Sequence, residues 1–148
     1  MDAISKRKTV AVTKIVAQPA DGLWRFIRSG GDVHRILPSV IQTCRVDGAG
    51  AGARRYCETK QGPLEETILT VDDAARLFRY RIDRQSMMPL EHYEGSVHVT
   101  DLGGGRAEVL WFATYELLDE KADGPVRDGL SGMFMTAIDG IGAVAATA

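Results

Sequence analysis

Three histidines are the residues whose type and spacing most directly suggest catalytic or metal-binding chemistry. His92 and His98 share one face of a predicted strand, but at about 3.3 Å per residue they lie roughly 20 Å apart, too far to share one metal ion. His34 is in a predicted short helix and could act as a general base, although a surface or capping histidine is the alternative. We therefore predict no metal site and no cofactor.

A set of aromatic residues offers a second kind of chemistry. Tyr80, Tyr93, Trp111 and Tyr115 combine broad apolar rings with hydroxyl or indole donors at their tips. Rings with a few polar groups are the usual lining of a small-molecule pocket, and a solid aromatic core is the alternative. The sequence shows no serine elbow, no Cys/His dyad and no glycine-rich phosphate loop.

Charge and composition limit the partners of the chain. The net charge of −2 argues against nucleic acid and against an anionic membrane surface, since both need a basic face. No run of eighteen apolar residues is present, so no membrane insertion is expected. The basic residues of Met1–Lys8 are not followed by an apolar stretch, which argues against a secretory signal. Cys44 and Cys57 form no metal or redox motif and are read as two reduced thiols in a cytoplasmic protein.

The order of hydrophobic patterns and turns predicts the elements that must position these residues. A strand over 8–16 precedes two short helices, the first after Pro19 and the second over 32–37. Strands are then expected at 40–46, 53–59, 64–71, 77–83, 91–100 and 106–117, and the short turns between them indicate an antiparallel meander. All 148 residues are expected to form a single domain.

The segment 123–148 is the only one that is long and apolar enough at helical spacing to form a long helix. Its main apolar face is formed by Val126, Leu130, Met133, Ala137, Ile141 and Val144, bordered by Phe134, Ile138 and Ala145. Four glycines interrupt it, at positions 129, 132, 140 and 142, so the helix is either kinked and mobile there or packed closely against a neighbour.

A sheet of about seven strands must curl around such a helix to bury it. Strand parity places Tyr80, Tyr93 and Trp111 on the inward faces, with small residues such as Gly95 and Ala113 beside them. Large rings beside small residues suit a cavity wall, although a packed core gives a similar pattern. Leu110 and Phe112 fall on the outer face, where a homodimer contact and cover by long polar side chains are alternative readings.

The sequence resembles the START/birch-pollen-allergen superfamily (SRPBCC), and within it the bacterial polyketide cyclase/dehydrase-like branch. The resemblance rests on segments in matching order across nearly the whole chain, among them QPADGLWRFIRSGGDVHRILPSV (18–40), GAGAGARR (48–55), LEETILTVDD (64–73), FRYRI (78–82), MPLEHYEGSVHV (88–99) and VLWFATYEL (109–117). It implies an α+β helix-grip fold, in which a curved seven-stranded antiparallel sheet wraps a long C-terminal helix around a ligand cavity. Relatives often carry His-Arg-Trp-His-Pro where this chain reads His34-Arg35-Ile36-Leu37-Pro38, which makes the cavity mouth more apolar.

If the strand register follows these family stretches, Arg55 and Glu66 face inward on neighbouring strands. A buried charge is costly unless it is paired, so the two would pair with each other or with a ligand. This pair would anchor a polar ligand end or supply a carboxylate for proton transfer. A slipped register, with both residues in solvent, and a purely structural ion pair remain alternatives.

We therefore predict a protein that binds a small hydrophobic or aromatic molecule, as a carrier, sensor or pathway accessory protein. The alternative is a cofactor-independent cyclase or dehydratase acting on a polyketide-like or aromatic substrate. Its catalytic candidates are Glu66, Arg55, Tyr93 and His34. The expected ligand contacts are Arg55, Cys57, Glu66, Ile68, Phe78, Tyr80, Tyr93, Val97, Trp111, Ala113, Leu130, Met133, Phe134 and Ala137. Met87, Met88, Met133 and Met135 either add adaptable walls or simply fill gaps.

Overall fold

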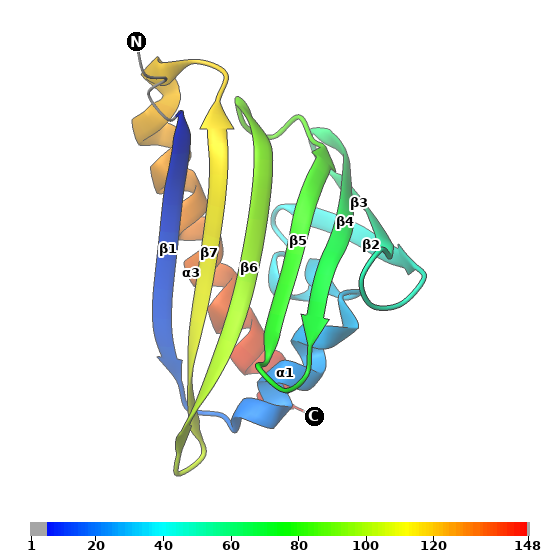
Figure 1. The fold of residues 1–148 in the computed structure, drawn as a ribbon, viewed down its shortest axis with the longest axis vertical. Helices are drawn as coiled ribbons and strands as arrows, with labels where there is room; N and C mark the ends of the chain where they lie inside the picture. Colours follow the sequence, from blue (N-terminus) through cyan, green and yellow to red (C-terminus); the bar gives the residue numbers. More distant parts are fainter. Residues whose placement is uncertain (1–5, 148) are drawn as a thin grey trace.

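A computed structural model of the protein describes residues 6–147, which form one antiparallel sheet and three α-helices (Figure 1). Residues 1–5 and 148, the start of the Met1–Lys8 segment and the end of the predicted long helix, lie outside the described residues. The strands, in spatial order β1-β7-β6-β5-β4-β3-β2, are β1 (Arg7–Val16), β2 (Ile41–Asp47), β3 (Arg54–Thr59), β4 (Gly62–Asp72), β5 (Leu77–Arg84), β6 (Leu90–Gly103) and β7 (Arg106–Leu117).

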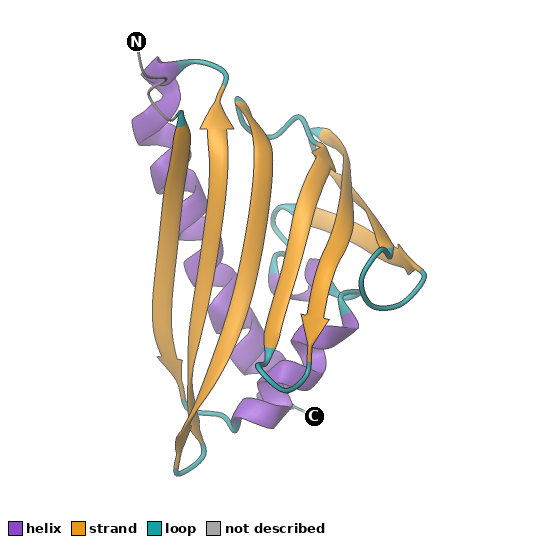
Figure 2. Ribbon diagram, in the orientation of Figure 1, coloured by secondary structure: helices purple, strands orange, loops and turns teal. Residues whose placement is uncertain are grey.

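The helices all lie on one face of this sheet (Figure 2). The long helix α3 (Asp123–Ala146) crosses the sheet diagonally and contacts β1 and β7, while α1 (Ala20–Ser29) and α2 (Val33–Ile36) pack against its C-terminal part. A sheet that is apolar on one face must bury that face, and α3 supplies the matching apolar surface. The predicted α+β helix-grip architecture is confirmed.

The glycines of α3 allow close packing, and the helix runs as one element from Asp123 to Ala146. A Cβ atom added at Gly140 would lie 2.8 Å from the Cα atom of Ile36, and one at Gly142 would lie 2.9 Å from a methyl group of Val16. The backbones of α2 and α3 therefore approach each other at a distance that only glycine permits. Of the two sequence-based readings, close packing accounts for Gly140 and Gly142.

The segment Glu120–Ala146 is long and apolar enough to cross a bilayer by length and composition alone. In this fold it is instead the core helix, since Val126, Leu130, Phe134, Ala137, Ile138 and Ile141 are buried against the sheet and the short helices. A core helix of a soluble domain satisfies the same criteria as a membrane span. Nothing in the fold of residues 6–147 suggests membrane insertion.

Three polar contacts fasten α1 to the turn between β4 and β5. Asp73 accepts hydrogen bonds from the Trp24 indole at 2.9 Å and from the Arg28 guanidinium at 2.8 Å. Arg76, from the same turn, donates to Asp21 at 2.8 Å. These contacts hold α1 over the end of the sheet, where it closes one side of the interior.

The prediction of two reduced thiols is wrong for this structure, because Cys44 and Cys57 form a disulfide. The antiparallel register of β2 and β3 places the two residues directly opposite each other, with their Cα atoms 4.1 Å apart. The sequence indicated a strand for each residue but not which residues would pair across them. The bond joins the edge strand β2 to β3, its neighbour in the sheet.

On the outer face of β7, Leu110 and Phe112 are half-buried and are not among the strongly exposed apolar residues. The neighbouring outer faces of β3–β6 carry ion pairs such as Arg79–Glu94 and Arg81–Asp83. The direct neighbours of Leu110 and Phe112 on this face are Thr13 and Ala11 of β1 and His98 and Ser96 of β6, so these ion pairs flank the two residues and do not decide between the two sequence-based readings. The homodimer stays a prediction.

Candidate functional site

The centre of the site is a buried ion pair on the inner face of the sheet. The register of β3 and β4 pairs Arg55 with Glu66, and the Arg55 Nε atom donates to Glu66 Oε1 at 2.8 Å. Both side chains are buried, with 5% and 4% of their surfaces exposed. The register is therefore not slipped, and two opposite charges neutralise each other inside the fold.

Arg55 is further held by the backbone and by aromatic rings. Its Nη1 atom donates to the carbonyl of Gly30 at 3.0 Å, and its guanidinium lies 5.7 Å from the ring centre of Phe78 and 5.3 Å from that of Tyr80. Such contacts stabilise a cation over an aromatic face. Burial lowers the pKa of Arg55, but the neighbouring Glu66 carboxylate outweighs it, so the pKa is raised and Arg55 stays a cation.

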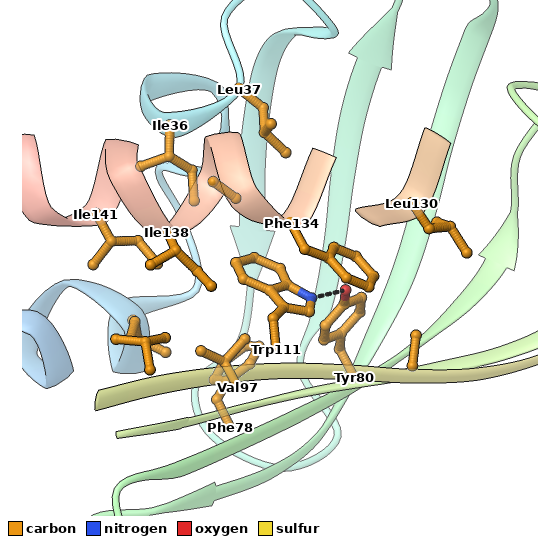
Figure 3. Close-up of a cluster of buried hydrophobic side chains, with 14 of the residues drawn as sticks. Ile36, Leu37, Phe78, Tyr80, Val97, Trp111, Leu130, Phe134, Ile138 and Ile141 are labelled. Atoms are coloured by element: carbon orange, nitrogen blue, oxygen red, sulfur yellow. Dashed lines mark hydrogen bonds between the residues drawn. The ribbon is translucent and has the colours of Figure 1, made fainter. Parts of the chain in front are cut away.

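Three aromatic side chains from β5, β6 and β7 form a hydrogen-bonded chain beside this pair. The Trp111 Nε1 atom donates to the Tyr80 hydroxyl at 3.1 Å, and the hydroxyls of Tyr80 and Tyr93 are 2.7 Å apart (Figure 3 shows the Trp111–Tyr80 bond). Burial raises the pKa of Tyr80 to about 12 and that of Tyr93 well above its usual value. Both phenols are therefore neutral hydrogen-bond donors at physiological pH.

Gly95 makes room for the Tyr80 ring. The two residues face each other across β5 and β6, and a Cβ atom on Gly95 would lie 2.4 Å from Cζ of Tyr80. A register shift lies just before Gly95 in β6, between Glu91 and Glu94, and His92 within it has a φ of 53°. Such a bulge re-aims the side chains next to it, and Tyr93 here points inward.

These residues lie against a cavity between the sheet, the short helices and α3. Its water-accessible space is about 90 Å³. The Trp111 ring stacks on Phe134 of α3 with ring centres 5.4 Å apart, so one wall of the cavity is a flat aromatic pair (Figure 3). The lining is mostly apolar and consists of Phe26, Ile27, Gly30, Asp32, Val33, Ile36, Leu37, Val40, Ile41, Arg55, Leu64, Glu66, Phe78, Tyr80, Ile82, Gln85, Met87, Met88, Leu90, Tyr93, Val97, Trp111, Leu130, Met133, Phe134 and Ile141.

The connector between β5 and β6 carries methionines to the cavity wall, and Gln85 holds it in shape. The Gln85 amide donates to the carbonyls of Met88 and Leu90 at 2.9 and 3.2 Å and accepts from the N–H groups of Met87 and Met88 at 2.8 and 2.9 Å. Met87 and Met88 are half-buried. Flexible thioether side chains at this position give the cavity an adaptable wall.

A second, polar cleft lies on the outer face where β5 and β6 separate beyond Arg81 and Glu94, the last pair of their ladder. It shares Ile82, Gln85, Leu90 and Tyr93 with the inner cavity. These four residues therefore form the partition between the outer cleft and the inner cavity. The separation of the two strands is visible in Figure 1.

Ten of the fourteen expected contact residues line the cavity, namely Arg55, Glu66, Phe78, Tyr80, Tyr93, Val97, Trp111, Leu130, Met133 and Phe134. The other four, Cys57, Ile68, Ala113 and Ala137, are buried but do not line it. Cys57 is taken up by the disulfide, and Ile68 packs under Gly30. Strand parity shows which face a residue is on, but not how far its side chain reaches.

His34 does not join the other catalytic candidates. It lies on α2, is half-buried and is not part of the cavity lining, and its Nδ1 atom has no hydrogen-bond partner among the described residues. His92 pairs with Glu116 on the outer face. Within residues 6–147, no cluster of histidine, cysteine or acidic side chains could hold a metal ion.

Sequence reasoning missed the part of the lining that comes from α1, α2 and the segment after them. Phe26, Val33, Val40 and Ile41 line the cavity, but a short amphipathic helix does not reveal which neighbour its apolar side covers. Gln85 was missed because a loop has no periodic pattern. The methionines beside it were the only signal.

Comparison with known families gives a decisive match. Residues 7–145 match the model of a family described as "Polyketide cyclase / dehydrase and lipid transport". The chain belongs to this family. The match spans every strand and nearly all of α3, so the polyketide cyclase/dehydrase and lipid transport family accounts for the whole described fold. A search of curated proteins found no significant match.

Three solved structures share this fold at low sequence identity. Norcoclaurine synthase from Thalictrum flavum, in complex with dopamine and hydroxybenzaldehyde, is 18% identical with a TM-score of 0.75, covering 93% of this chain and 86% of that one. Ginseng major latex-like protein 151 from Panax ginseng is 18% identical with a TM-score of 0.78, covering 94% and 97%. A protein from Bacillus thuringiensis is 15% identical with a TM-score of 0.79, covering 93% and 98%.

These structures establish the helix-grip fold, and the family description joins polyketide-processing enzymes with lipid transport. Both activities concern hydrophobic small molecules. The membership therefore supports a hydrophobic ligand and does not select one reaction.

Proposed function

We propose that this protein reversibly binds a small hydrophobic or aromatic molecule in the cavity between the sheet and α3, as a carrier, sensor or pathway accessory protein. The observation that carries this proposal is a mostly apolar cavity with a stacked Trp111–Phe134 wall. Apolar lining with a few fixed polar groups is the usual composition of a small-molecule site.

The size of the cavity adds a condition to this proposal. Its 90 Å³ is less than the roughly 150 Å³ of an apolar cavity that accepts benzene. A ligand with one or more rings therefore needs the wall to move, and half-buried Met87, Met88 and Met133 are the lining residues best suited to move.

The state of the polar groups favours binding over catalysis. Arg55 is a paired cation, and the raised pKa values of Tyr80 and Tyr93 keep both phenols protonated. General acid–base catalysis works best with a group whose pKa lies near the working pH. Arg55 and one of the two phenols therefore meet a ligand as hydrogen-bond donors, since the other phenol uses its proton in the Tyr80–Tyr93 bond.

Native mass spectrometry and the fluorescence of Trp111 test the proposal. We expect the purified protein to carry or take up an apolar molecule and to release it unchanged, with a change in Trp111 emission. A Trp24→Phe variant isolates this signal, since Trp24 does not line the cavity. A protein that stays empty, and whose emission is the same with every apolar probe, would contradict ligand binding.

One observation favours a second candidate, a cofactor-independent cyclase or dehydratase. The Oε2 atom of buried Glu66 has no hydrogen-bond partner among the described residues, so it is free to accept a proton from a bound substrate. Arg55 and Tyr93 would then polarise a carbonyl and Trp111 would hold the substrate rings. For this candidate Glu66→Gln should abolish turnover while binding persists, and unchanged turnover would exclude Glu66 as the acid or base.

A further inference from the structure

The ionisable groups of the buried cavity wall carry no net charge. Arg55 and Glu66 neutralise each other at 2.8 Å, and Tyr80 and Tyr93 are uncharged. The only other ionisable residue of the described lining is Asp32, which is exposed and lies 3.6 Å from Arg35. A negatively charged ligand would find no uncompensated cation among these lining residues, because Glu66 offsets the attraction of Arg55. Burying its charge would therefore cost free energy that no ion pair returns.

The same wall nevertheless offers unused hydrogen-bonding groups. A guanidinium has five N–H donors, and the described residues accept from only two atoms of Arg55, Nε and Nη1. Glu66 uses only Oε1 toward the described residues, which leaves Oε2 as an acceptor. Donors and an acceptor therefore lie side by side at the end of an apolar cavity.

The aromatic chain adds one further donor. Trp111, Tyr80 and Tyr93 bring three polar hydrogens, and their two hydrogen bonds use two of them. Whichever phenol donates to the other, one O–H group is left without an acceptor among these three side chains. This count does not depend on which hydroxyl donates.

We propose that the ligand of this cavity is uncharged, with an apolar ring-bearing body and one polar end of the carbonyl, amide or hydroxyl type, and that carboxylates are rejected. The inference rests on the proposed binding function and adds the ligand's charge and polar end. A neutral polar end can accept from Arg55 or a phenol and can donate to Glu66 without an ionic penalty. A carboxylate brings a second negative charge beside Glu66, and the single cation Arg55 cannot neutralise both carboxylates in a buried site, where charge interactions are stronger than in water.

Three single-ring probes of nearly the same shape test this inference by two-dimensional NMR titration of the wild-type protein at neutral pH. Acetophenone and benzamide are neutral, and benzoate is anionic. We expect both neutral probes to bind at least about tenfold more tightly than benzoate, which corresponds to about 1.4 kcal/mol. This comparison needs no variant and therefore does not depend on how a mutation folds.

A Glu66→Gln variant sharpens the test, since it removes the negative charge and leaves Arg55 as an uncompensated cation. We expect the variant to bind benzoate at least about tenfold more tightly than wild type does, with acetophenone changed by less than about threefold. Folding of the variant is checked from its NMR spectrum. An unchanged preference for acetophenone in the folded variant would overturn the role of Glu66.

The outcomes separate the inference from the function on which it rests. Benzoate binding as tightly as acetophenone and benzamide in wild type would overturn the charge selectivity and leave ligand binding intact. Absence of binding for all three probes would instead contradict the binding function itself.

Discussion

At the scale of single residues, the position of the Tyr80 ring depends on the missing side chain of Gly95. The ring lies over Gly95 on the neighbouring strand and is held by Trp111 and Tyr93. It also lies beneath the Arg55 guanidinium. Gly95 therefore affects both the hydrogen-bonded chain and the ion pair, although it has no polar side chain itself.

Replacing Gly95 by alanine should destabilise the protein by about 1–3 kcal/mol, the usual effect of overpacking a core. The new Cβ atom would meet the Tyr80 ring at 2.4–2.5 Å, and a ring cannot bend away as a flexible chain end can. Urea unfolding measures the loss. In a Tyr80→Leu background the same substitution should cost clearly less, and equal losses in the two backgrounds would show that the ring is not the obstacle.

The tyrosines predict how stability depends on alkaline pH. The folded-state pKa of Tyr80 is raised to about 12, and that of Tyr93 is also raised, so the folded state holds these protons more tightly than the unfolded state. Stability should be fully present below about pH 10 and fall as the pH rises from about 10 through 12, with each pKa unit worth about 1.4 kcal/mol. Urea unfolding between about pH 8 and 12 measures this, with Tyr80→Phe giving a shallower decline. A stability that does not change across that range would contradict the burial of these phenols.

The residues of the site were predicted from the sequence to different degrees. Parity and family stretches placed Arg55, Glu66 and Trp111 on the inward face, and the structure has all three there. The bond of Arg55 to the carbonyl of Gly30 could not be predicted, because it joins residues 25 positions apart through a loop conformation. Local patterns contain no information about such a contact.

At the scale of elements, α3 meets α2 through the backbone approach at Gly140. The Ile36 atoms within 3 Å of the position that a Cβ atom would take include backbone atoms, which cannot rotate away. Gly132 lies in the same helix, and a Cβ atom there would have none of the described neighbours within 4 Å. Glycine is therefore required by close packing at position 140, whereas the space around position 132 would admit a side chain.

Alanine substitutions at these two positions should have opposite effects. Gly140→Ala should destabilise the protein by about 1–3 kcal/mol by forcing α2 away from α3. Gly132→Ala should stabilise it by about 0.5–1 kcal/mol, because alanine has the higher helix propensity. Thermal unfolding of the two variants measures both changes. Gly132→Ala serves as the matched control, and stabilisation by both substitutions would contradict the close approach of the helices.

The elements were predicted well where a pattern is long and bounded by turns. The predicted bounds of β7 and the start of α3 agree with the structure, because alternation and helical spacing extend over many residues there. β4 starts earlier than predicted, since Gly62 and Pro63 were read as a turn. Pro63 is tolerated because β5 begins to pair with β4 only at Glu65, so β4 has one neighbour at that point.

At the scale of the whole molecule, the sheet consists of two well-paired parts, β1-β7-β6 and β5-β4-β3-β2. They are joined by the short β5–β6 ladder, and we call this junction, with the unpaired strand ends beside it, the seam. β5 and β6 pair only from Leu77 to Arg81 on the β5 side, whereas β6 and β7 pair along most of their lengths. Residues 82–84 of β5 and 90–93 of β6 border the outer cleft. Local opening should therefore be easiest at this seam.

Hydrogen exchange should reveal the seam directly. We expect slow exchange for the amides at the centre of β6 and β7, around Val97 and Trp111, and faster exchange for the amides of residues 82–84 and 90–93 that face the cleft. Two-dimensional NMR after transfer to D₂O measures the individual rates. Equal protection of both regions would contradict a seam of lower local stability.

The disulfide between Cys44 and Cys57 links this structure to the redox state of its surroundings. Such bonds persist in oxidising compartments and are rare in the reducing cytosol. A chain that matures in the cytoplasm, as the sequence predicts, would carry two thiols, and β2 would be held at the sheet edge by its backbone pairing with β3, by α2 and by the contact of Arg45 with Tyr56. Forming the bond removes two hydrogen atoms, so the intact mass of the chain taken from its native cells records the compartment in which it folded.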